Sequence, residues 1–201
     1  MRLLILCLMS VSILFALDNG ALNAYKQHHY KKAFTLYKEA ADKGDTTAQN
    51  ALSYLYFNGV GVAKNPKEGL YWLQKAADKG DKRACFDLGM IYLMGENVTK
   101  DLTKAVHYLE IASKKGDSEA TYNLALMYYN GDGVKQDIKK AASLLEVAAK
   151  SGHLKAKNNV GRVYMQLLDF KKAKYWLEEN VKDGDKSAAA LLKEIEAAHK
   201  E

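Results

Sequence analysis

The chain contains little proline and little cysteine. It has one proline and two cysteines in 201 residues. Proline disrupts helix interiors, so its scarcity leaves long stretches free to form helix, and abundant alanine, leucine and lysine favour helix over strand. Cys7 lies in an apolar N-terminal stretch, which leaves Cys85 alone in the rest of the chain. A single thiol cannot form an internal disulfide. We expect Cys85 to be a small buried helix residue; a reactive thiol or an intermolecular link is the alternative.

Charge of one sign is also lacking. The 30 basic and 24 acidic residues give a net charge of +6, but they alternate along most of the sequence. Such mixing is typical of solvated helix faces. No run of arginines and no RNA-stacking motif is present. We therefore expect no nucleic-acid partner.

Long hydrophobic runs are absent after Leu17. Arg2 precedes an apolar stretch from Leu3 to Leu17, which is shorter than the roughly 20 residues of a membrane-spanning helix but typical of a secretory signal. We predict a signal peptide over 1–16, cleaved after Ala16, and a periplasmic or secreted domain over 17–201 with no membrane span. Leu14 fits the −3 position of the cleavage site poorly. An uncleaved anchor and a buried first helix are therefore the alternatives.

Sequence motifs for catalysis and metal binding are missing. Ser-x-x-Lys, Ser-Asp-Asn and Lys-Thr-Gly, the motifs of serine β-lactamases, do not occur, nor does His-Glu-x-x-His. The histidines are scattered without ligand spacing at His28, His29, His107, His153 and His199. We predict no catalytic, metal or cofactor site.

The sequence instead contains an internal repeat. Related segments begin at residues 40, 76, 112 and 148, each 36 residues after the last, with the sequences AADKGDTTAQ, AADKGDKRAC, ASKKGDSEAT and AAKSGHLKAK. A fifth, NVKDGDKSAA, begins at residue 180, after a shorter interval of 32. Apolar residues at helical spacing predict two helices per unit, called here the first and second helix.

Glycine and aspartate mark the helix boundaries in this repeat. Gly44, Gly80, Gly116, Gly152 and Gly184 follow the second helices, where positive φ can close the last turn. An aspartate that can cap the next helix usually follows, at Asp45, Asp81, Asp117 and Asp185. This recurring glycine and aspartate pattern therefore predicts the same two-helix unit throughout the chain.

Gly131-Asp132-Gly133 suggests at first a calcium or phosphate loop, but the repeat contradicts both. Its two glycines correspond to Gly59 and Gly61 in one unit and to Gly95 and Asn97 in the next. Asparagine tolerates positive φ, so the shared requirement is backbone geometry. The spaced oxygen ligands of an EF-hand and the Gly-Lys-Ser/Thr of a phosphate loop are absent. The segment is predicted to be a turn between helices.

These residues identify a resemblance. The segment ACFDLGMIYLMGENVTKDLTKAVHYLEIASKKGD and its neighbours resemble the Sel-like repeat family, relatives of the tetratricopeptide repeat. Units 45–80, 81–116 and 117–152 are full length; the units before and after lack the longer turn and look like tetratricopeptide repeats. The resemblance implies an all-α, right-handed α-solenoid of about five helix-turn-helix repeats plus a C-terminal capping helix. It also implies a non-catalytic adaptor surface.

The chain is also similar to a cysteine-rich bacterial subgroup of that family. In this subgroup cysteines eight residues apart clamp adjacent helices, and its members are associated with penicillin binding and β-lactamase activity. Cys85 matches one such position, but its expected partner position holds Ala77. The resemblance therefore leaves a β-lactam-binding protein or β-lactamase as an alternative function.

The resemblance places a concave groove along the first helices. With Gly89 as the register mark, the expected groove residues are Asn50, Tyr54, Asp87, Tyr122, Asn123, Tyr129, Asn158, Asn159 and Arg162. Asparagine amides can pair with a peptide backbone, tyrosines offer flat contact area, and Arg162 can attract a carboxylate. The alternative is that the tyrosines pack between units and the asparagines are solvated.

The sequence therefore predicts an exported scaffold that binds a protein or peptide in its groove. Binding of cell-wall fragments is a further alternative, because amides and aromatic rings also suit that ligand class. Tyr92, Tyr128 and Tyr164 are predicted to be core residues instead.

Overall fold

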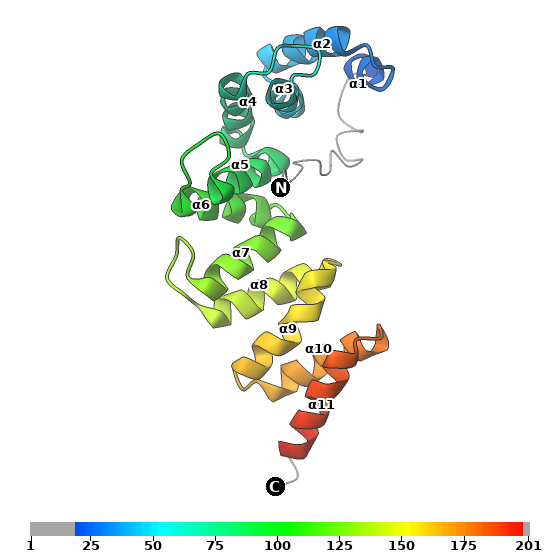
Figure 1. Ribbon diagram of the computed structural model, residues 1–201, viewed down its shortest axis with the longest axis vertical. Coiled ribbons are helices and arrows are strands. Elements are labelled where there is room, and N and C mark those ends of the chain that lie inside the picture. The colour runs from blue at the N-terminus through cyan, green and yellow to red at the C-terminus, as the bar shows by residue number, and fades with distance from the viewer. Residues whose placement is uncertain (1–18, 199–201) are drawn as a thin grey trace. The chain divides into compact units, whose positions relative to one another are not determined.

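The computed structural model describes residues 19–198, which form eleven helices and no strand (Figure 1). The helices are α1 (Asn19–Lys26), α2 (Tyr30–Asp42), α3 (Thr46–Asn58), α4 (Pro66–Asp78), α5 (Lys82–Met94), α6 (Leu102–Lys114), α7 (Ser118–Asn130), α8 (Ile138–Lys150), α9 (Leu154–Gln166), α10 (Phe170–Lys182) and α11 (Lys186–Ala198). The predicted signal peptide over 1–16 lies outside the described residues.

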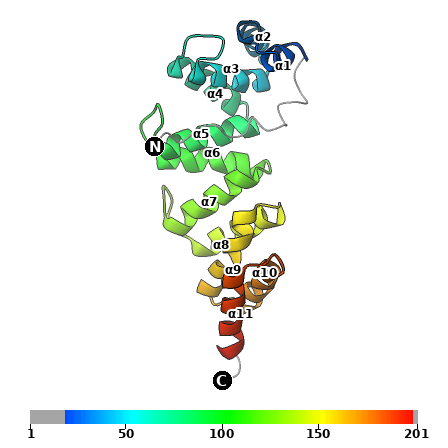
Figure 2. The same cartoon turned by 45° about the vertical axis from the view of Figure 1, so that its right-hand side comes forward.

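The helices form two compact units, 19–88 and 89–198, which divide within α5. In the first unit α1 packs against α2, α2 against α3 and α3 against α4, and in the second unit each helix from α6 to α10 packs against the next (Figures 1 and 2). Packing between consecutive helices is the arrangement of a repeat solenoid. The described residues hold five helix pairs followed by α11, so the predicted helical repeat fold is confirmed.

The predicted caps set the helix boundaries. The Asp117 side chain accepts a hydrogen bond from the Ala120 N–H at 2.9 Å, and Asp137 accepts one from Lys140 N–H at 2.8 Å. Equivalent bonds form at Asp45, Asp81, Asn65, Asp101 and Asp185. The five glycines after the second helices all have positive φ. Each side-chain oxygen satisfies an amide that the first helical turn leaves unpaired.

The Gly131-Asp132-Gly133 segment is a turn, as predicted. Gly131 ends α7 with φ 83°, and Gly133 has φ 69°. A Cβ on Gly133 would lie 2.5 Å from the carbonyl oxygen of Leu102 at the start of α6. A Cβ on Gly61 would likewise collide with the carbonyl oxygen of Tyr30 at the start of α2. The second glycine lets the turn rest on the backbone of the preceding second helix.

Each unit has an alanine-rich core. The first contains Ala33, Ala48, Leu52, Leu55 and Trp72, and the second is built from α7 to α11 around residues such as Leu145, Val160 and Leu177. Small alanines let neighbouring helices approach closely, and leucines fill the remaining space. Tyr164 is buried as predicted, whereas Tyr92 and Tyr128 are only partly buried because their rings reach the surface.

Candidate functional site

The predicted groove residues all lie on first helices. Asn50 and Tyr54 are on α3, Asp87 is on α5, and the other six are on α7 and α9. The two units place these residues differently, and the arrangement on α7 and α9 is the more complete.

A polar ladder joins α7 and α9 along the predicted face. Asn159 Nδ2 donates to the Tyr122 hydroxyl at 3.3 Å, and the Tyr129 hydroxyl donates to Gln166 Oε1 at 2.9 Å. At the other end His153 Nε2 lies 3.0 Å from Glu119 Oε2, and the His153 ring stacks on Tyr122 with ring centres 4.4 Å apart. The two tyrosines lie about two turns apart on α7, and each is held by contacts to α9 of the next repeat.

His153 has its tautomer fixed by its neighbours. Its Nδ1 accepts a hydrogen bond from the Ala156 N–H at 3.1 Å, which caps α9. Because that nitrogen accepts, the proton is on Nε2, which donates to Glu119. His153 was not among the predicted groove residues. Its signal in the sequence was its place, since the corresponding position of four other units holds an aspartate.

Arg162 extends the contacts from α9 to α11. Its guanidinium donates to the Ser187 hydroxyl and lies 3.8 Å from Asp185 Oδ2. Asn123 is occupied within its own helix, where Nδ2 donates to the Glu119 carbonyl at 2.8 Å. Asn158 is exposed, and its side-chain amide has no hydrogen-bond partner among residues 19–198. Asn158 is thus the predicted amide most available to a ligand.

The first unit offers less open surface. Asn50 is 7% exposed, because α3 is covered by both α2 and α4, and it leaves little side chain for a ligand. Tyr54 lies beside Tyr25; burial first, and then the neighbouring Tyr54 hydroxyl, raise the pKa of Tyr25 to about 12. Asp87 pairs with Arg83 on its own helix at 3.2 Å. These residues are not joined in a ladder like that of α7 and α9.

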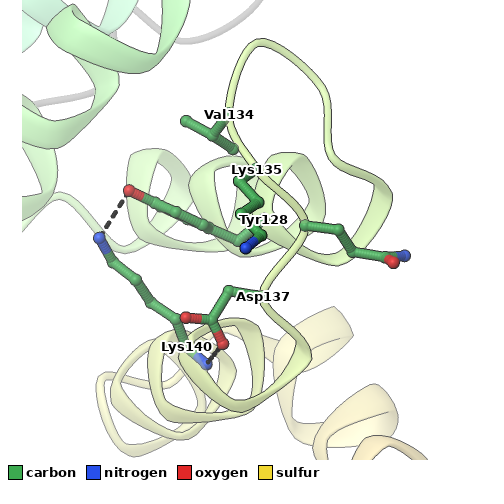
Figure 3. Close-up of a pocket in the computed structure, with 6 residues that line it drawn as sticks. Tyr128, Val134, Lys135, Asp137 and Lys140 are labelled. Atoms are coloured by element: carbon green, nitrogen blue, oxygen red, sulfur yellow. Dashed lines mark hydrogen bonds between the residues drawn. The ribbon is translucent and has the colours of Figure 1, made fainter.

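A second polar feature, which joins a tyrosine of a first helix to charged residues of the second helices before and after it, was not predicted. The Tyr128 hydroxyl donates to Glu110 Oε1 at 3.0 Å and accepts from Lys140 Nζ at 2.5 Å, while Lys140 lies 3.7 Å from Glu110. We call such a set a tyrosine triad. Figure 3 shows Tyr128 and Lys140 joined at the edge of a shallow hollow that Val134, Lys135 and Asp137 also line. The triad connects three helices of two successive repeats.

The next repeat contains a matching triad. The Tyr164 hydroxyl donates to Glu146 Oε2 at 2.5 Å and accepts from Lys172 Nζ at 3.3 Å. Burial, and then the bond to Glu146, raise the pKa of Tyr164. Hydrogen bonds from Lys150 first and from Tyr164 second lower the pKa of Glu146. The carboxylate is therefore held in its charged form.

In the first unit the corresponding charges are reversed. Tyr56 has Lys38 in the place of Glu110 and Glu68 in the place of Lys140, each 72 residues earlier (38 to 110 and 68 to 140). Burial, and then the negative charge of Glu68, raise the pKa of Tyr56, whereas Lys38 opposes the rise. Both arrangements place one cation and one carboxylate beside a tyrosine. The two charges have exchanged places between the preceding and the following second helix.

A family model described as Sel1 repeat matches residues 24–45, 46–81, 82–117, 118–153 and 155–179. The chain belongs to the Sel1 repeat family. The shorter first and last units, whose turns resemble tetratricopeptide repeats, are included in the match. The helix pairs described above are therefore Sel1 repeats, a scaffold suited to protein–protein interaction.

Solved structures of Sel1 repeat proteins are similar to this chain. A Sel1 repeat protein from Oxalobacter formigenes is 27% identical with a TM-score of 0.76, over 86% of this chain and 72% of that one. The protective antigen c5321 of uropathogenic Escherichia coli, described as having an SLR fold, is 25% identical with a TM-score of 0.76, over 89% of this chain but 41% of that one. This chain thus corresponds to less than half of c5321. A search of curated protein sequences gave no match.

Cysteine-rich protein B of Helicobacter pylori is a further similar structure. It is 28% identical with a TM-score of 0.51, over 64% of this chain and 92% of that one. In the chain described here, by contrast, Cys85 is buried, as expected, and its Sγ lies 3.6 Å from the Ala77 carbonyl oxygen. Gln49 Nε2 bonds the Ala41 carbonyl, and Thr121 bonds Ser113, also across eight residues. Residues eight positions apart on successive helices are therefore joined by hydrogen bonds in this chain.

Two other features bear on the site. Among residues 19–198, histidine, cysteine and acidic side chains nowhere gather in threes that could hold a metal ion. Within the same range, every helix is too short or too polar to cross a bilayer.

Proposed function

We propose that this Sel1 repeat protein is an exported scaffold that binds an extended protein or peptide segment along the face of α7 and α9. The polar ladder carries the proposal. In this ladder Asn159 and Gln166 of α9 hold Tyr122 and Tyr129 of α7 in place. The side chain of Asn158 is not part of the ladder and is free to pair with a peptide backbone.

The ladder makes this face rigid before a ligand arrives. Tyr122 is fixed by Asn159 and His153, and Tyr129 by Gln166. Ordering these side chains in advance lowers the entropy lost on binding. Lys155, exposed one turn before Asn158, provides positive charge for a carboxylate of the ligand.

The test is recovery of a partner with substituted proteins. Tyr122→Ala combined with Asn158→Ala should reduce co-purification of the wild-type partner about tenfold or more, because aromatic anchors dominate such surfaces. Tyr175→Ala is the matched control, since Tyr175 is 56% exposed on the second helix α10. Equal recovery with both variants would contradict the groove.

Export has a separate test. If the N-terminal stretch is a signal peptide, the protein recovered from the periplasm or medium begins at Leu17, and intact mass spectrometry measures this directly. A protein that retains Met1 and sediments with membranes would support the anchor alternative.

The two remaining alternatives are tested on the same preparation. Turnover of nitrocefin by a preparation free of contaminating lactamase would favour the β-lactamase alternative. Competition of soluble muropeptides with the protein partner would favour cell-wall binding. We expect neither outcome, because the side chains of the ladder are arranged along a line, as an extended peptide segment requires.

A further inference from the structure

Helix α9 is capped by a histidine, where the corresponding helices of other repeats are capped by aspartates. Each of these aspartates accepts a hydrogen bond from the amide three residues later: Asp45, Asp81, Asp117 and Asp185. His153 does the same through Nδ1, which accepts from the Ala156 N–H at 3.1 Å. A carboxylate accepts at any pH above about 4, but an imidazole nitrogen accepts only while the ring is neutral. Of these five caps, that of α9 alone can be removed by a proton near neutral pH.

The His153 ring is nearly buried and is held on three sides. Its side chain is 8% exposed. Its Nδ1 faces the first turn of α9, its Nε2 donates to Glu119 Oε2 at 3.0 Å, and its face stacks on Tyr122 with the two ring planes 22° apart. The cap of α9 and the position of Tyr122 therefore depend on the same ring.

Protonation of His153 removes the cap in either orientation of the ring. Both nitrogens of an imidazolium carry protons, so turning the ring over restores no acceptor for the Ala156 N–H. Loss of a cap disfavours the present position of the ring by a factor of about five. The cation would also lie at the positive end of the α9 dipole, which disfavours it by a further factor of about two to five.

The charge pair with Glu119 opposes this loss but is the weaker effect. Glu119 is 54% exposed, and pairs of this kind contribute a factor of about five at most. Burial of the ring adds to the cost of its charge. The losses exceed the gain, so the protonated ring is more stable away from the start of α9.

No other group around the ring has an ordinary pKa near neutrality. From α7 the ring faces Glu119 and Tyr122. The charged groups of the flanking chain are lysines, of which the first pairs with Glu146 and the last with Asp183: Lys150, Lys155 and Lys157. In water carboxyl groups titrate near pH 4, and tyrosine and lysine near pH 10, whereas imidazole titrates near pH 6.5.

We propose that His153 is a proton-operated cap: at mildly acidic pH its ring leaves the start of α9, uncaps the helix and frees Tyr122 from its stack. The face of α7 and α9 is thus ordered at neutral pH and loosened by acid. Weaker ligand binding in acid follows only if the proposed function holds, because Tyr122 is then no longer fixed in advance. The switch itself needs no ligand, so it can be tested without one.

The test is an NMR titration of the protein from pH 7.5 to 5.5. The Ala156 amide reports on the cap, and the Ala120 amide, which an aspartate caps at 2.9 Å in the preceding repeat, is the internal control. Protection of Ala156 against hydrogen exchange, corrected for the intrinsic rate, should fall about fivefold, the contribution of one cap. The ring signals of Tyr122 should change with the same midpoint, and those of Tyr129, at the other end of the ladder, should not.

Two variants assign the titration to His153. His153→Asn keeps a side-chain acceptor at every pH of the titration, so the Ala156 amide should stay equally protected throughout. Glu119→Gln keeps an acceptor for Nε2 but removes the negative charge that favours the imidazolium, so the midpoint should move to lower pH. Residue 119 is more than half exposed, so the second variant should fold as the wild type does. Circular dichroism at both ends of the pH range checks the fold of each.

Three results at the amides would overturn the proposal. These are unchanged protection of Ala156 in the wild type, an equal loss in His153→Asn, and a parallel loss at Ala120. Loss of protection at Ala156 with unchanged Tyr122 signals would show that the stack survives protonation, and would likewise overturn the proposed switch. Because no partner is used, failure of the groove to bind a peptide leaves this result unaffected.

Discussion

Gly131 and Gly133 lie two residues apart in one turn, but they meet different constraints. Both have positive φ, whereas only Gly133 approaches other backbone, with its Cβ position 2.5 Å from the Leu102 carbonyl oxygen. The nearest atom to a Cβ on Gly131 is 3.4 Å away. Conformation alone limits the first glycine, and conformation plus contact limits the second.

We therefore expect Gly133→Ala to be the more damaging of the pair. Gly131→Ala should lower the free energy of unfolding by about 1 kcal/mol, the penalty of the left-handed conformation. Gly133→Ala should lower it by about 3 kcal/mol, because the turn must also move away from α6. Urea denaturation measures both values, and equal losses would show that contact with Leu102 is unimportant.

Leu168 offers the opposite kind of substitution. It has φ 58° in the short turn between α9 and α10, with a side chain that is 72% exposed. Leu168→Gly should raise the free energy of unfolding by about 0.5 kcal/mol, because relief of the left-handed penalty exceeds the entropy that glycine adds to the unfolded chain.

The control for this substitution is Leu154→Gly. Leu154 is 73% exposed at the start of α9, in helical conformation. Glycine there should lower the free energy of unfolding by about 0.5 to 1 kcal/mol. Thermal denaturation of the two variants should therefore shift in opposite directions, and a shared direction would refute the strain at Leu168.

At the scale of elements, the tyrosine triads connect repeats through charge. Reversing one charge, with Glu110→Lys or Lys140→Glu, should lower the free energy of unfolding by about 1 kcal/mol, since both groups are partly exposed. The double variant should recover most of this loss, because it reproduces the charge order that Lys38 and Glu68 have around Tyr56. The coupling energy from a double-mutant cycle measures the effect.

The control pair for this cycle is Glu179 with Lys182. They are three residues apart on α10, and the Lys182 side chain is 70% exposed. Their coupling should be close to zero, as is usual for exposed pairs. A coupling at Glu110 and Lys140 no larger than this would show that the triad contributes nothing beyond a surface ion pair.

Glu146 gives the second triad a pH dependence of defined sign. Its folded-state pKa is lowered, chiefly by Lys150 and then by Tyr164. Its contribution to stability is therefore present above the unfolded value of about 4.3 and is lost as pH falls through the folded value. Glu146→Gln should destabilise the protein at neutral pH and have a smaller effect at pH about 3. Urea midpoints across this range measure the difference.

Local signals explain why so much of the element pattern was predictable. Asp117 and Gly131 act within a few residues of their own position, so their roles follow from spacing in the sequence. The triads pair residues such as Tyr128 and Glu110 from different repeats, and which side chains meet depends on how the helices pack. Asn50 shows the same limit, because its helix position was expected but its burial between α2 and α4 was not.

For the whole molecule, the repeats depend on their neighbours for a covered core. In the second unit α11 supplies Ala188 and Ile195 to the buried cluster that includes Trp176. Removing residues 185–201 should therefore expose α10, lower the thermal midpoint by several degrees and promote association, since a terminal repeat needs a polar outer face. Size-exclusion chromatography and calorimetry measure both effects; Lys193→Ala, on the exposed face of α11, should change neither.

The partner of the scaffold is the property that local signals did not specify. The tyrosines and asparagines of α7 and α9 were expected on one face, but His153, Gln166 and Ser187 were not, because their bonds cross between repeats. The sequence repeat predicts which helix a residue occupies, whereas the ligand depends on the few positions where the repeats differ.

The reversed charges around Tyr56 and Tyr128 restrict how such an array can change length during evolution. Unequal recombination between copies can delete whole periods while it keeps every helix and turn. A deletion that joined α2 to α7 would place Lys38 next to Lys140, with two cations at one tyrosine hydroxyl and no carboxylate. Such a recombinant would be in register but electrostatically mismatched. Because of this charge order, the repeats are not interchangeable. Gain or loss of a copy is tolerated where the joined helices bring opposite charges to the tyrosine, and is selected against where they bring like charges.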